Sequence, residues 1–371
     1  MCARPRRASQ IGGAARIAGT LAAAGAGALA YGSLIERNAY TVRRLTLRVL
    51  SAGAPSITLL HLSDIHALSR QRGKLAMVSS LASLRPDIVL CTGDMLSDPR
   101  AIPALMSALA PLLRLPGGFV PGNNDYYAPR PKNPLRYFSP TRHRIHGSPM
   151  PWAELARALS RAGWADLTHA RATLRAGGAR IALAGTDDAH LRRARYARIA
   201  GPADPSADVR IGVTHTPEPS LLDRFAADGY DLVVAGHTHG GQIRVPFGPA
   251  IVTNCGLSRW KARGVSQWPG GPVTQPPEAA VSQWPEAAVS RLPQPLGSQQ
   301  PEAAVAQWPQ TLGSPQPESP WPGAHGSRQP GAGPMLLHVS AGLGSSPYAP
   351  VRIACRPEAT LLTLVPRQPA P

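Results

Sequence analysis

Lysine and aromatic side chains are scarce in this 371-residue chain, which limits the partners it can have. Only three of its 39 basic residues are lysine, and Phe, Trp and Tyr make up 5% of the sequence. The net charge is +18, but the arginines are scattered and form no basic stripe with interleaved aromatic residues. This composition argues against nucleic acid as a direct partner. An anionic substrate or an acidic membrane surface remains compatible with the charge.

Cysteine is also sparse, and its spacing excludes two classes of site. Cys2, Cys91, Cys255 and Cys355 lie far apart and form no Cys-x-x-Cys pair. The sequence therefore favours neither a zinc ribbon nor a disulfide framework. Cys91 lies in the apolar run DIVLC and is expected in the core, whereas a Cys255–Cys355 bridge remains open for a chain outside the cytosol.

Charged residues are absent from positions 17–35, IAGTLAAAGAGALAYGSLI, which follow an arginine-containing segment. As a helix this stretch would span about 28 Å, close to the hydrocarbon thickness of a bilayer. A basic, then apolar, then small-residue layout is also typical of export signals, with Ala28-Leu29-Ala30 as a cleavage site. We therefore expect residues 1–40 to be a membrane anchor or export signal, and the protein to be at the cell membrane or exported rather than cytoplasmic. An Ala/Gly-rich soluble helix is the alternative.

Strand and helix patterns alternate from residue 41 onward. Helical patterns cover residues 76–87 and 152–163. Apolar runs that end in polar residues, typical of strands, lie at 57–64, 87–94, 179–188, 209–217 and 230–241. This alternation predicts a layered α/β fold, in which ligands gather beyond the carboxyl ends of the strands. We expect residues 41–263 and 335–371 to build one domain.

Residues 264–334 break this pattern, because Pro, Gly, Ser, Gln, Ala and Trp dominate them. PEAAVSRLPQPLGSQQ at 285–300 is followed by PEAAVAQWPQTLGSPQ at 301–316. This repeat is too rich in proline for a helical solenoid and has no core-forming period. We expect a disordered insertion. Its tryptophans are either contacts for a partner or membrane, or the inert result of repeat expansion.

Five predicted strand ends carry residues of the types that commonly bind metal ions. In chain order they are Asp64-Ile65-His66, Gly93-Asp94, Gly122-Asn123-Asn124-Asp125, Thr214-His215-Thr216 and Gly236-His237-Thr238-His239. Each motif alone is more often structural, but five such ends in one chain indicate a shared site. Two divalent ions about 3.5–4 Å apart need a bridging carboxylate, and mixed nitrogen and oxygen ligands suit Mn, Fe or Zn. The sequence therefore predicts two bound divalent metal ions.

The series DIH, GD, GNND, THTP and GHTHGGQ resembles the calcineurin-like metallophosphoesterase superfamily, in particular its bacterial membrane-associated members. The resemblance covers roughly residues 55–260 and 335–365. It implies two packed mixed β-sheets flanked by helices, and hydrolysis of phosphomono- or phosphodiesters by a hydroxide that two metal ions activate. It also implies the ligands of the two metals, with Asp94 bridging them: Asp64, His66 and His239 at one, and Asn123, His215 and His237 at the other.

Asn124 departs from the family pattern, which has histidine at this position. In the family that histidine contacts the phosphate and is proposed to protonate the leaving group. Asparagine donates a hydrogen bond but gives up no proton at neutral pH. We therefore expect Asn124 and Asp94 to be the catalytic residues, with acid catalysis lost or moved to Asp125 or a metal-bound water. Activated phosphoesters would then be the favoured substrates.

Other polar residues near the motifs have weaker support. Asp187 and Asp188 end a strand and are expected to form a structural turn. Three basic residues after GNND are equally compatible with a substrate rim and with a solvated loop: Arg130, Lys132 and Arg136. The histidines outside the motifs are expected on the surface: His143, His146 and His190.

The leading functional prediction is a two-metal phosphoesterase, and the apolar amino terminus suggests a lipid-linked phosphoester as its substrate. A non-catalytic scaffold, stabilised by metal and recruiting partners through its repeats, is an alternative from another class. A nuclease is a third possibility, although the sequence lacks a basic cluster that would form a groove.

Overall fold

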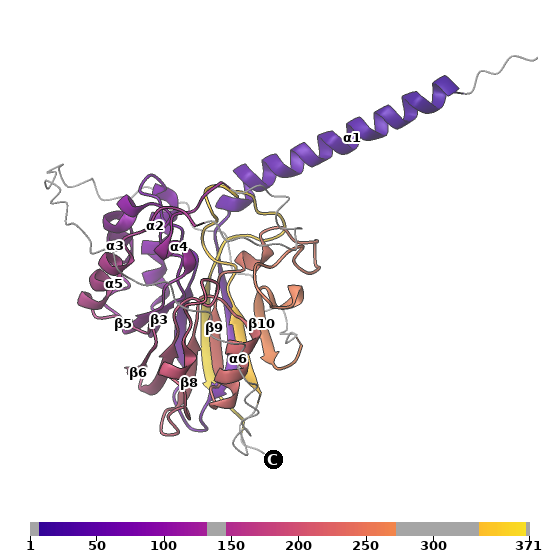
Figure 1. Cartoon of the computed structure of the whole chain (residues 1–371). Helices are drawn as coiled ribbons and strands as arrows, with labels where there is room; N and C mark the ends of the chain where they lie inside the picture. The colour runs from indigo at the N-terminus through magenta and orange to yellow at the C-terminus, as the bar shows by residue number, and fades with distance from the viewer. Residues whose placement is uncertain (1–6, 132–145, 272–333, 369–371) are drawn as a thin grey trace, which may run out of the picture.

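The computed structural model describes residues 7–131, 146–271 and 334–368, and these fold mainly into two six-stranded β-sheets (Figure 1). The first sheet has the order β1-β12-β2-β3-β4-β5 and the second has the order β10-β11-β9-β8-β7-β6. Both sheets are mixed and helices flank them, so the predicted fold class is confirmed.

The first sheet contains strands from both ends of the described chain. β1 pairs in parallel with β12, and β12 pairs antiparallel with β2. The pairs β2–β3, β3–β4 and β4–β5 are all parallel. The strands of this sheet are β1 (Thr41–Leu50), β2 (Ile57–Leu62), β3 (Ile88–Cys91), β4 (Gly117–Phe119), β5 (Ala165–Asp166) and β12 (Glu358–Pro366).

The second sheet is parallel in its centre and antiparallel at both edges. β7, β8, β9 and β11 run parallel, while β6 and β10 pair antiparallel with β7 and β11. Its strands are β6 (Ala170–Ala176), β7 (Ala179–Gly185), β8 (Val209–Val213), β9 (Leu232–Ala235), β10 (Gly264–Trp268) and β11 (Met335–Val339).

Three apolar layers hold the sheets and helices together. Between the sheets, side chains such as Leu59 and Leu90 meet Ile211 and Val234. A second layer joins the first sheet to α2 (Arg72–Ser80), α3 (Ile102–Leu109) and α5 (Trp152–Arg161). A third joins the second sheet to α6 (Pro219–Ala227). Central parallel strands such as β3 and β9 are therefore buried on both faces, which explains their continuous apolar sequences.

Shorter helices connect these layers. The four-residue helix α4 (Asn123–Tyr126) follows β4 directly. Six 3-10 helices occur in the described residues: η1 (Glu36–Asn38), η2 (Leu81–Leu84), η3 (Pro99–Ala101), η5 (Tyr196–Arg198), η6 (His239–Gly241) and η7 (Arg259–Lys261).

The helix α1 (Arg7–Leu34) extends away from the sheets (Figure 1). Its end is held where the Arg352 amide donates to the Gly32 carbonyl over 3.2 Å. Just after it, Glu36 Oε1 accepts from the Cys355 amide over 2.6 Å. Within the described part of the chain, no helix combines the length and apolarity that a membrane crossing requires. The predicted transmembrane anchor is therefore not supported, and the export signal stays a prediction.

The ordered domain extends further than the sequence predicted. Gly264–Trp268, placed at the start of the expected insertion, form β10. Trp268 is buried in the third apolar layer, and its indole donates to Asp223 Oδ1 over 2.8 Å. Residues 272–333, which contain the repeats, lie outside the described residues.

Candidate metal centre

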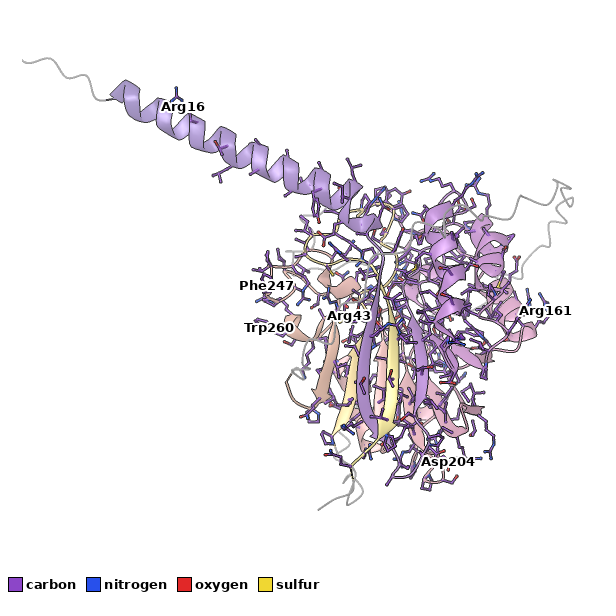
Figure 2. The ribbon with its side chains drawn as sticks, turned by 180° about the vertical axis from the view of Figure 1, so that it is seen from behind. Arg16, Arg43, Arg161, Asp204, Phe247 and Trp260 are labelled. Carbon is purple, nitrogen blue, oxygen red and sulfur yellow. The ribbon has the colours of Figure 1, made fainter. Side chains whose placement is uncertain are left out.

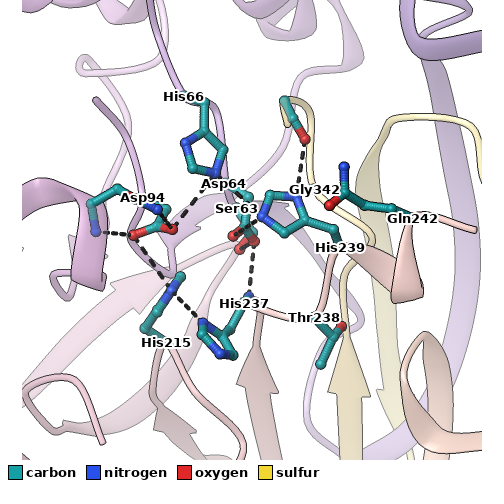
Figure 3. Close-up of polar contacts among 12 residues, drawn as sticks. Ser63, Asp64, His66, Asp94, His215, His237, Thr238, His239, Gln242 and Gly342 are labelled. Carbon is teal, nitrogen blue, oxygen red and sulfur yellow. Dashed lines mark hydrogen bonds and ion pairs between the residues drawn. The ribbon is translucent and has the colours of Figure 1, made fainter. Parts of the chain in front are cut away.

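The five predicted motifs converge at one edge of the paired sheets. Asp64 and His66 follow β2, Asp94 follows β3 and Asn123 follows β4. From the second sheet, His215 follows β8, and His237 and His239 follow β9. Because these strands run parallel within each sheet, their carboxyl ends lie at the same edge. Figure 3 shows the side chains from both sheets turned toward one another.

Five of the seven predicted ligands have a left-handed backbone. Their φ angles are +49° at Asp64, +47° at His66, +51° at Asp94, +68° at His237 and +49° at His239. A non-glycine residue in this region costs on the order of 1–3 kcal/mol and persists only where the surroundings impose it. Strain concentrated at one edge of the sheets indicates that this edge is the functional site.

Four side chains form a compact group of possible ligand atoms. One ligand atom each from Asp64, His66, Asp94 and His239 lies within 4.8 Å of the others, and all four residues are buried. His66 Nε2 is 3.3 Å from His239 Nε2 and 3.6 Å from Asp94 Oδ2. His239 Nε2 is 3.4 Å from Asp64 Oδ1. Imidazole nitrogens and carboxylate oxygens in this proximity fit a divalent cation.

A second group lies on the other side of Asp94. His215 Nε2 is 3.5 Å from Asp94 Oδ1 and 3.3 Å from His237 Nδ1. Among the described residues, Asp64 Oδ1, Asn123 Oδ1 and His237 Nε2 are buried without a hydrogen-bond partner. An unsatisfied buried polar atom costs about 1–3 kcal/mol, so three at predicted ligands need an explanation. Metal coordination would satisfy the Asp64 and Asn123 oxygens, and His237 presents Nδ1 to the second group, so the residues fit two divalent ions.

Comparison with known proteins agrees with this geometry. Residues 57–241 match the family model of the calcineurin-like phosphoesterases. The chain belongs to this family. The family's hydrolases act on phosphoester bonds, and the Asp and His cluster of this phosphoesterase suits their divalent metals.

Three relatives match this phosphoesterase over about half of its length. "Uncharacterized protein YpbG" of Bacillus subtilis is 27% identical over 209 residues, which cover 55% of this chain and 70% of the relative. The "Putative metallophosphoesterase F40B5.2" of Caenorhabditis elegans is 25% identical over 222 residues, which cover 56% and 41%. The "Uncharacterized metallophosphoesterase YkuE" of Bacillus subtilis is 25% identical over 201 residues, which cover 52% and 60%. The match thus spans less than two thirds of the last two.

Two solved structures are also similar over half of the chain. A 5'-nucleotidase precursor from Thermus thermophilus is 14% identical with a TM-score of 0.31, covering 54% of this chain and 45% of that one. Purple acid phosphatase PPD1 from yellow lupin (Lupinus luteus) is 12% identical with a TM-score of 0.32, covering 51% and 39%. These low scores add nothing to the family assignment.

Hydrogen bonds fix the orientation of three of the four predicted ligand histidines in the phosphoesterase. His66 Nδ1 is 3.0 Å from Ser97 Oγ. His215 Nδ1 is 2.7 Å from the Thr92 carbonyl, and His239 Nδ1 is 3.1 Å from the Gly344 carbonyl. A carbonyl accepts only, so these two rings carry their proton on Nδ1 and leave Nε2 unprotonated when neutral. This arrangement directs Nε2 toward the predicted metals.

Asp64 is oriented through a buried chain of polar groups that joins the two sheets. Its Oδ2 accepts from Ser63 Oγ over 2.5 Å and from the His237 amide over 3.0 Å. Thr92 Oγ1 donates to Ser63 Oγ over 2.7 Å and lies 2.9 Å from His61 Nε2. With Oδ2 occupied, Oδ1 of Asp64 is left to face His239.

This series of buried polar groups continues from His61 in the first sheet to His338 in the second, with 2.9 Å between the two Nδ1 atoms. Burial lowers the pKa of His61 well below its usual value and that of His338 to about 4. Both rings are therefore neutral near pH 7. His61 and His338 each lie within an ordinary apolar strand pattern, so sequence reasoning missed both histidines.

Asn124 contacts Asp94 in this structure. Its amide nitrogen Nδ2 donates to Asp94 Oδ2 over 2.6 Å, and its backbone N–H donates to Asp94 Oδ1 over 2.7 Å. Asp125 instead accepts from the backbone amides of Gly122, Met95 and Leu96 over 2.8–3.1 Å. Asp125 therefore holds the turn before α4 together, while burial and Asp94 raise the pKa of its carboxyl to about 7, so its role as a substitute acid stays a prediction.

The Asp187–Asp188 segment forms a structural turn, as predicted. Asp187 Oδ2 accepts from Arg193 Nε over 3.0 Å, and Asp188 accepts from the His190 amide and from Thr216 Oγ1. This turn places the half-buried His190 ring with its centroid 4.6 Å from that of His237. The predicted surface position of His190 holds only in part, because the half-buried ring lies against His237, and no motif signalled this contact.

The remaining residues without a motif lie elsewhere. His146 is exposed and its ring lies 4.5 Å from that of Tyr127. Arg130 is exposed, and its Nη1 donates to the His146 carbonyl over 3.2 Å. Three residues lie outside the described residues: Lys132, Arg136 and His143.

Two buried basic side chains support the loops that carry the predicted ligands, and sequence reasoning missed both. Lys74 Nζ donates to the carbonyls of Ile65 and His66 over 2.6 and 2.9 Å. Burial lowers the pKa of Lys74 to about 7. The guanidinium of Arg352 donates to the carbonyls of residues 341, 342, 344 and 355, and so closes the loop whose Gly344 carbonyl accepts from His239.

Proposed function

We propose that this phosphoesterase hydrolyses phosphomono- or phosphodiesters with two divalent metal ions held at the predicted ligands. One ion would be held by Asp64, His66 and His239 and the other by Asn123, His215 and His237, with Asp94 between them. The observation that carries the proposal is the orientation of Asp94. Its Oδ2 faces His66 over 3.6 Å and its Oδ1 faces His215 over 3.5 Å, so each oxygen is directed at a different ligand group.

Bound divalent ions at such a site would polarise a water molecule for attack on phosphorus and neutralise the charge on the phosphate oxygens. The residues of the protein would hold the metal-binding groups in place. Asn124 donates twice to Asp94, which would keep both carboxylate oxygens directed at their separate groups. The carbonyls that accept from His215 and His239 would hold these rings in the tautomer that binds a metal through Nε2.

The side chain of Asn124 also restricts the substrates that this site can use well. An amide gives no proton to a leaving oxygen at neutral pH, so a poor alkoxide leaving group would receive no acid catalysis from this position. We propose that phosphoesters with an acidic leaving group are the preferred substrates. The export signal predicted at the amino terminus would place the enzyme at or beyond the cell membrane, where lipid-linked phosphoesters are candidate substrates.

Hydrolysis of bis(p-nitrophenyl) phosphate and p-nitrophenyl phosphate by the full chain, with Mn²⁺ added or chelated, tests the proposal. The variant Asp94→Asn should reduce turnover by about a hundredfold or more, because it removes the charge between the two groups. Asp98→Asn makes the same chemical change at a half-buried carboxylate that pairs with the exposed Arg100, and should leave turnover unchanged.

Metal binding is measured on the same proteins by titration calorimetry. The wild type should bind two equivalents of Mn²⁺, and Asp94→Asn should bind fewer or bind them more weakly. Two bound equivalents without hydrolysis of either ester would contradict the catalytic proposal and favour the scaffold. The ratio of diester to monoester turnover would identify the substrate class.

A further inference from the structure

An exposed hairpin loop begins directly after the metal centre. Residues 243–251 follow η6, which contains His239, and Arg244 pairs with Ala250 across the loop. The Gly248 amide donates to the Val245 carbonyl over 2.8 Å, which closes the turn Val245-Pro246-Phe247-Gly248. Arg244 holds this turn to the site, because its guanidinium donates to the carbonyls of Gly240 and Gly248 over 3.0 and 2.8 Å.

Phe247 occupies an unfavourable position at the tip of this turn. Its φ is +59°, at the third residue of a turn whose second residue is proline, where glycine or asparagine is preferred. Its side chain is fully exposed, with a relative accessibility of 108%. The sequence thus places an aromatic residue in a strained backbone with no apolar contact in return. Such a combination indicates a functional rather than a structural role.

Further apolar side chains surround the tip. Val245 is 52% exposed, Ile251 45% and Ile243 36%. Trp260 is 56% exposed and lies at the same edge of the molecule as Phe247 (Figure 2). Large apolar side chains that gather on one exposed surface mark an interaction site.

The positive charge around this loop indicates which kind of partner it binds. Residues 242–263 contain four basic residues, Arg244, Arg259, Lys261 and Arg263, and no aspartate or glutamate. Exposed aliphatic and aromatic residues beside basic ones are typical of proteins that bind the interface of an anionic membrane. A second copy of the same surface would bring like charges together. A projecting tip also gives a protein partner little concave surface in which to bury a hot spot.

We propose that the loop of residues 243–251, with Phe247 at its tip and Trp260 beside it, docks the domain on an anionic phospholipid bilayer. Phe247 and Val245 would enter the boundary between head groups and acyl chains, while Arg259 and Lys261 would attract the lipid phosphates. Docking stands apart from hydrolysis. Docking would also bring head-group phosphoesters close to the metal centre, which precedes the loop. This second step rests on the proposed function.

Flotation of the full chain with vesicles tests the docking. Vesicles of phosphatidylcholine with phosphatidylglycerol should bind the wild type, and vesicles of phosphatidylcholine alone should bind it much less. Phe247→Gly removes the aromatic group and relieves the positive φ, so it should leave the thermal midpoint unchanged or raise it. The same variant should weaken vesicle partitioning by about tenfold, because it removes one inserted aromatic side chain.

Leu29→Ser is the matched control, since Leu29 is 54% exposed on α1 and does not belong to the loop. It should bind vesicles as the wild type does. Loss of binding in Leu29→Ser with normal binding in Phe247→Gly would assign the membrane contact to α1 and overturn the proposal. Absence of wild-type binding to anionic vesicles would overturn it as well.

Two further measurements separate the alternatives. Light scattering of the wild type should show a monomer, and a dimer that Phe247→Gly dissociates would instead make this loop a contact between copies of the chain. Asp94→Asn should bind vesicles like the wild type, whether or not the wild type hydrolyses phosphoesters. Failure of the docking proposal and failure of the proposed function are therefore distinguishable.

Discussion

Replacing Glu358 by glutamine should lower the free energy of unfolding by about 3 kcal/mol at neutral pH. Glu358 is 1% exposed and is the first residue of β12, the strand that lies between β1 and β2. Its carboxylate accepts from Arg43 Nε over 3.0 Å and from the Ala341 amide over 3.1 Å, and Arg263 Nε lies 3.8 Å away. The residue therefore joins the first sheet to the loop that supports His239.

The magnitude and its sign follow from the pKa of this carboxyl. Burial alone would raise the pKa of Glu358, but Arg43, Arg263 and the Ala341 amide outweigh it and lower the pKa from 4.5 to about 2. A carboxyl pKa lowered from 4.5 to about 2 corresponds to about 3 kcal/mol of folding free energy, at about 1.36 kcal/mol for each tenfold change in the ionisation constant. Because the folded-state pKa is depressed, this stability is fully present above about pH 4.5. It is lost as the pH falls through about 2.

Urea unfolding of the wild type and Glu358→Gln, each at pH 7 and at pH 3, measures the effect. The difference between the two proteins should be largest at pH 7 and should shrink markedly at pH 3. Glu154→Gln changes an exposed glutamate on α5 and should have almost no effect at either pH. A loss below about 1 kcal/mol at pH 7, or a loss that is equal at both pH values, would refute the reasoning.

Three other changes test the site. Gly342→Ala should weaken Mn²⁺ binding by about tenfold or more in calorimetry, because φ is +69° and a Cβ would lie 2.6 Å from Asp64 Cβ. Gly53→Ala has similar strain (φ +81°) but open space, so it should lower stability alone. Asn124→His should raise turnover of alkyl phosphates at least about tenfold more than that of nitrophenyl esters, and equal effects would contradict the acid argument. Replacing residues 272–333 by a short Gly/Ser linker should preserve hydrolysis, since β10 and β11 pair antiparallel; loss of activity would show that the segment takes part.

The strands and their polar ends could be predicted because both depend on local sequence. The apolar runs before Asp64, Asp94, His215 and His237 are buried on both faces, and burial on both faces leaves a continuous apolar pattern. The likeness of these strand ends to a known family then supplied the ligand set. The structure places those residues together, while their roles as ligands stay a prediction until metal binding is measured.

The surroundings of the site could not be predicted, because they depend on contacts between distant segments. His61 meets His338 across 277 residues, and Arg352 closes a loop beside a histidine from another strand. The left-handed backbone of Asp64 and His66 also has no local signal, since neither residue type requires a positive φ. His190 reaches the site because Asp188 accepts from its amide in the turn, and the sequence does not specify the direction of that turn.

The placement of β11 and β12 has a consequence for the order in which the protein assembles on the ribosome. These two strands come last in the described chain, yet β12 lies between β1 and β2, and β11 lies between β9 and β10. Until residues 335–366 have been translated, β2 and β9 each have one edge without a neighbour, and His239 Nδ1 has no Gly344 carbonyl to accept its hydrogen bond. Unpaired strand edges bind other chains readily. Translation that stalls before residue 335 should therefore yield an aggregation-prone nascent chain rather than a partly active enzyme.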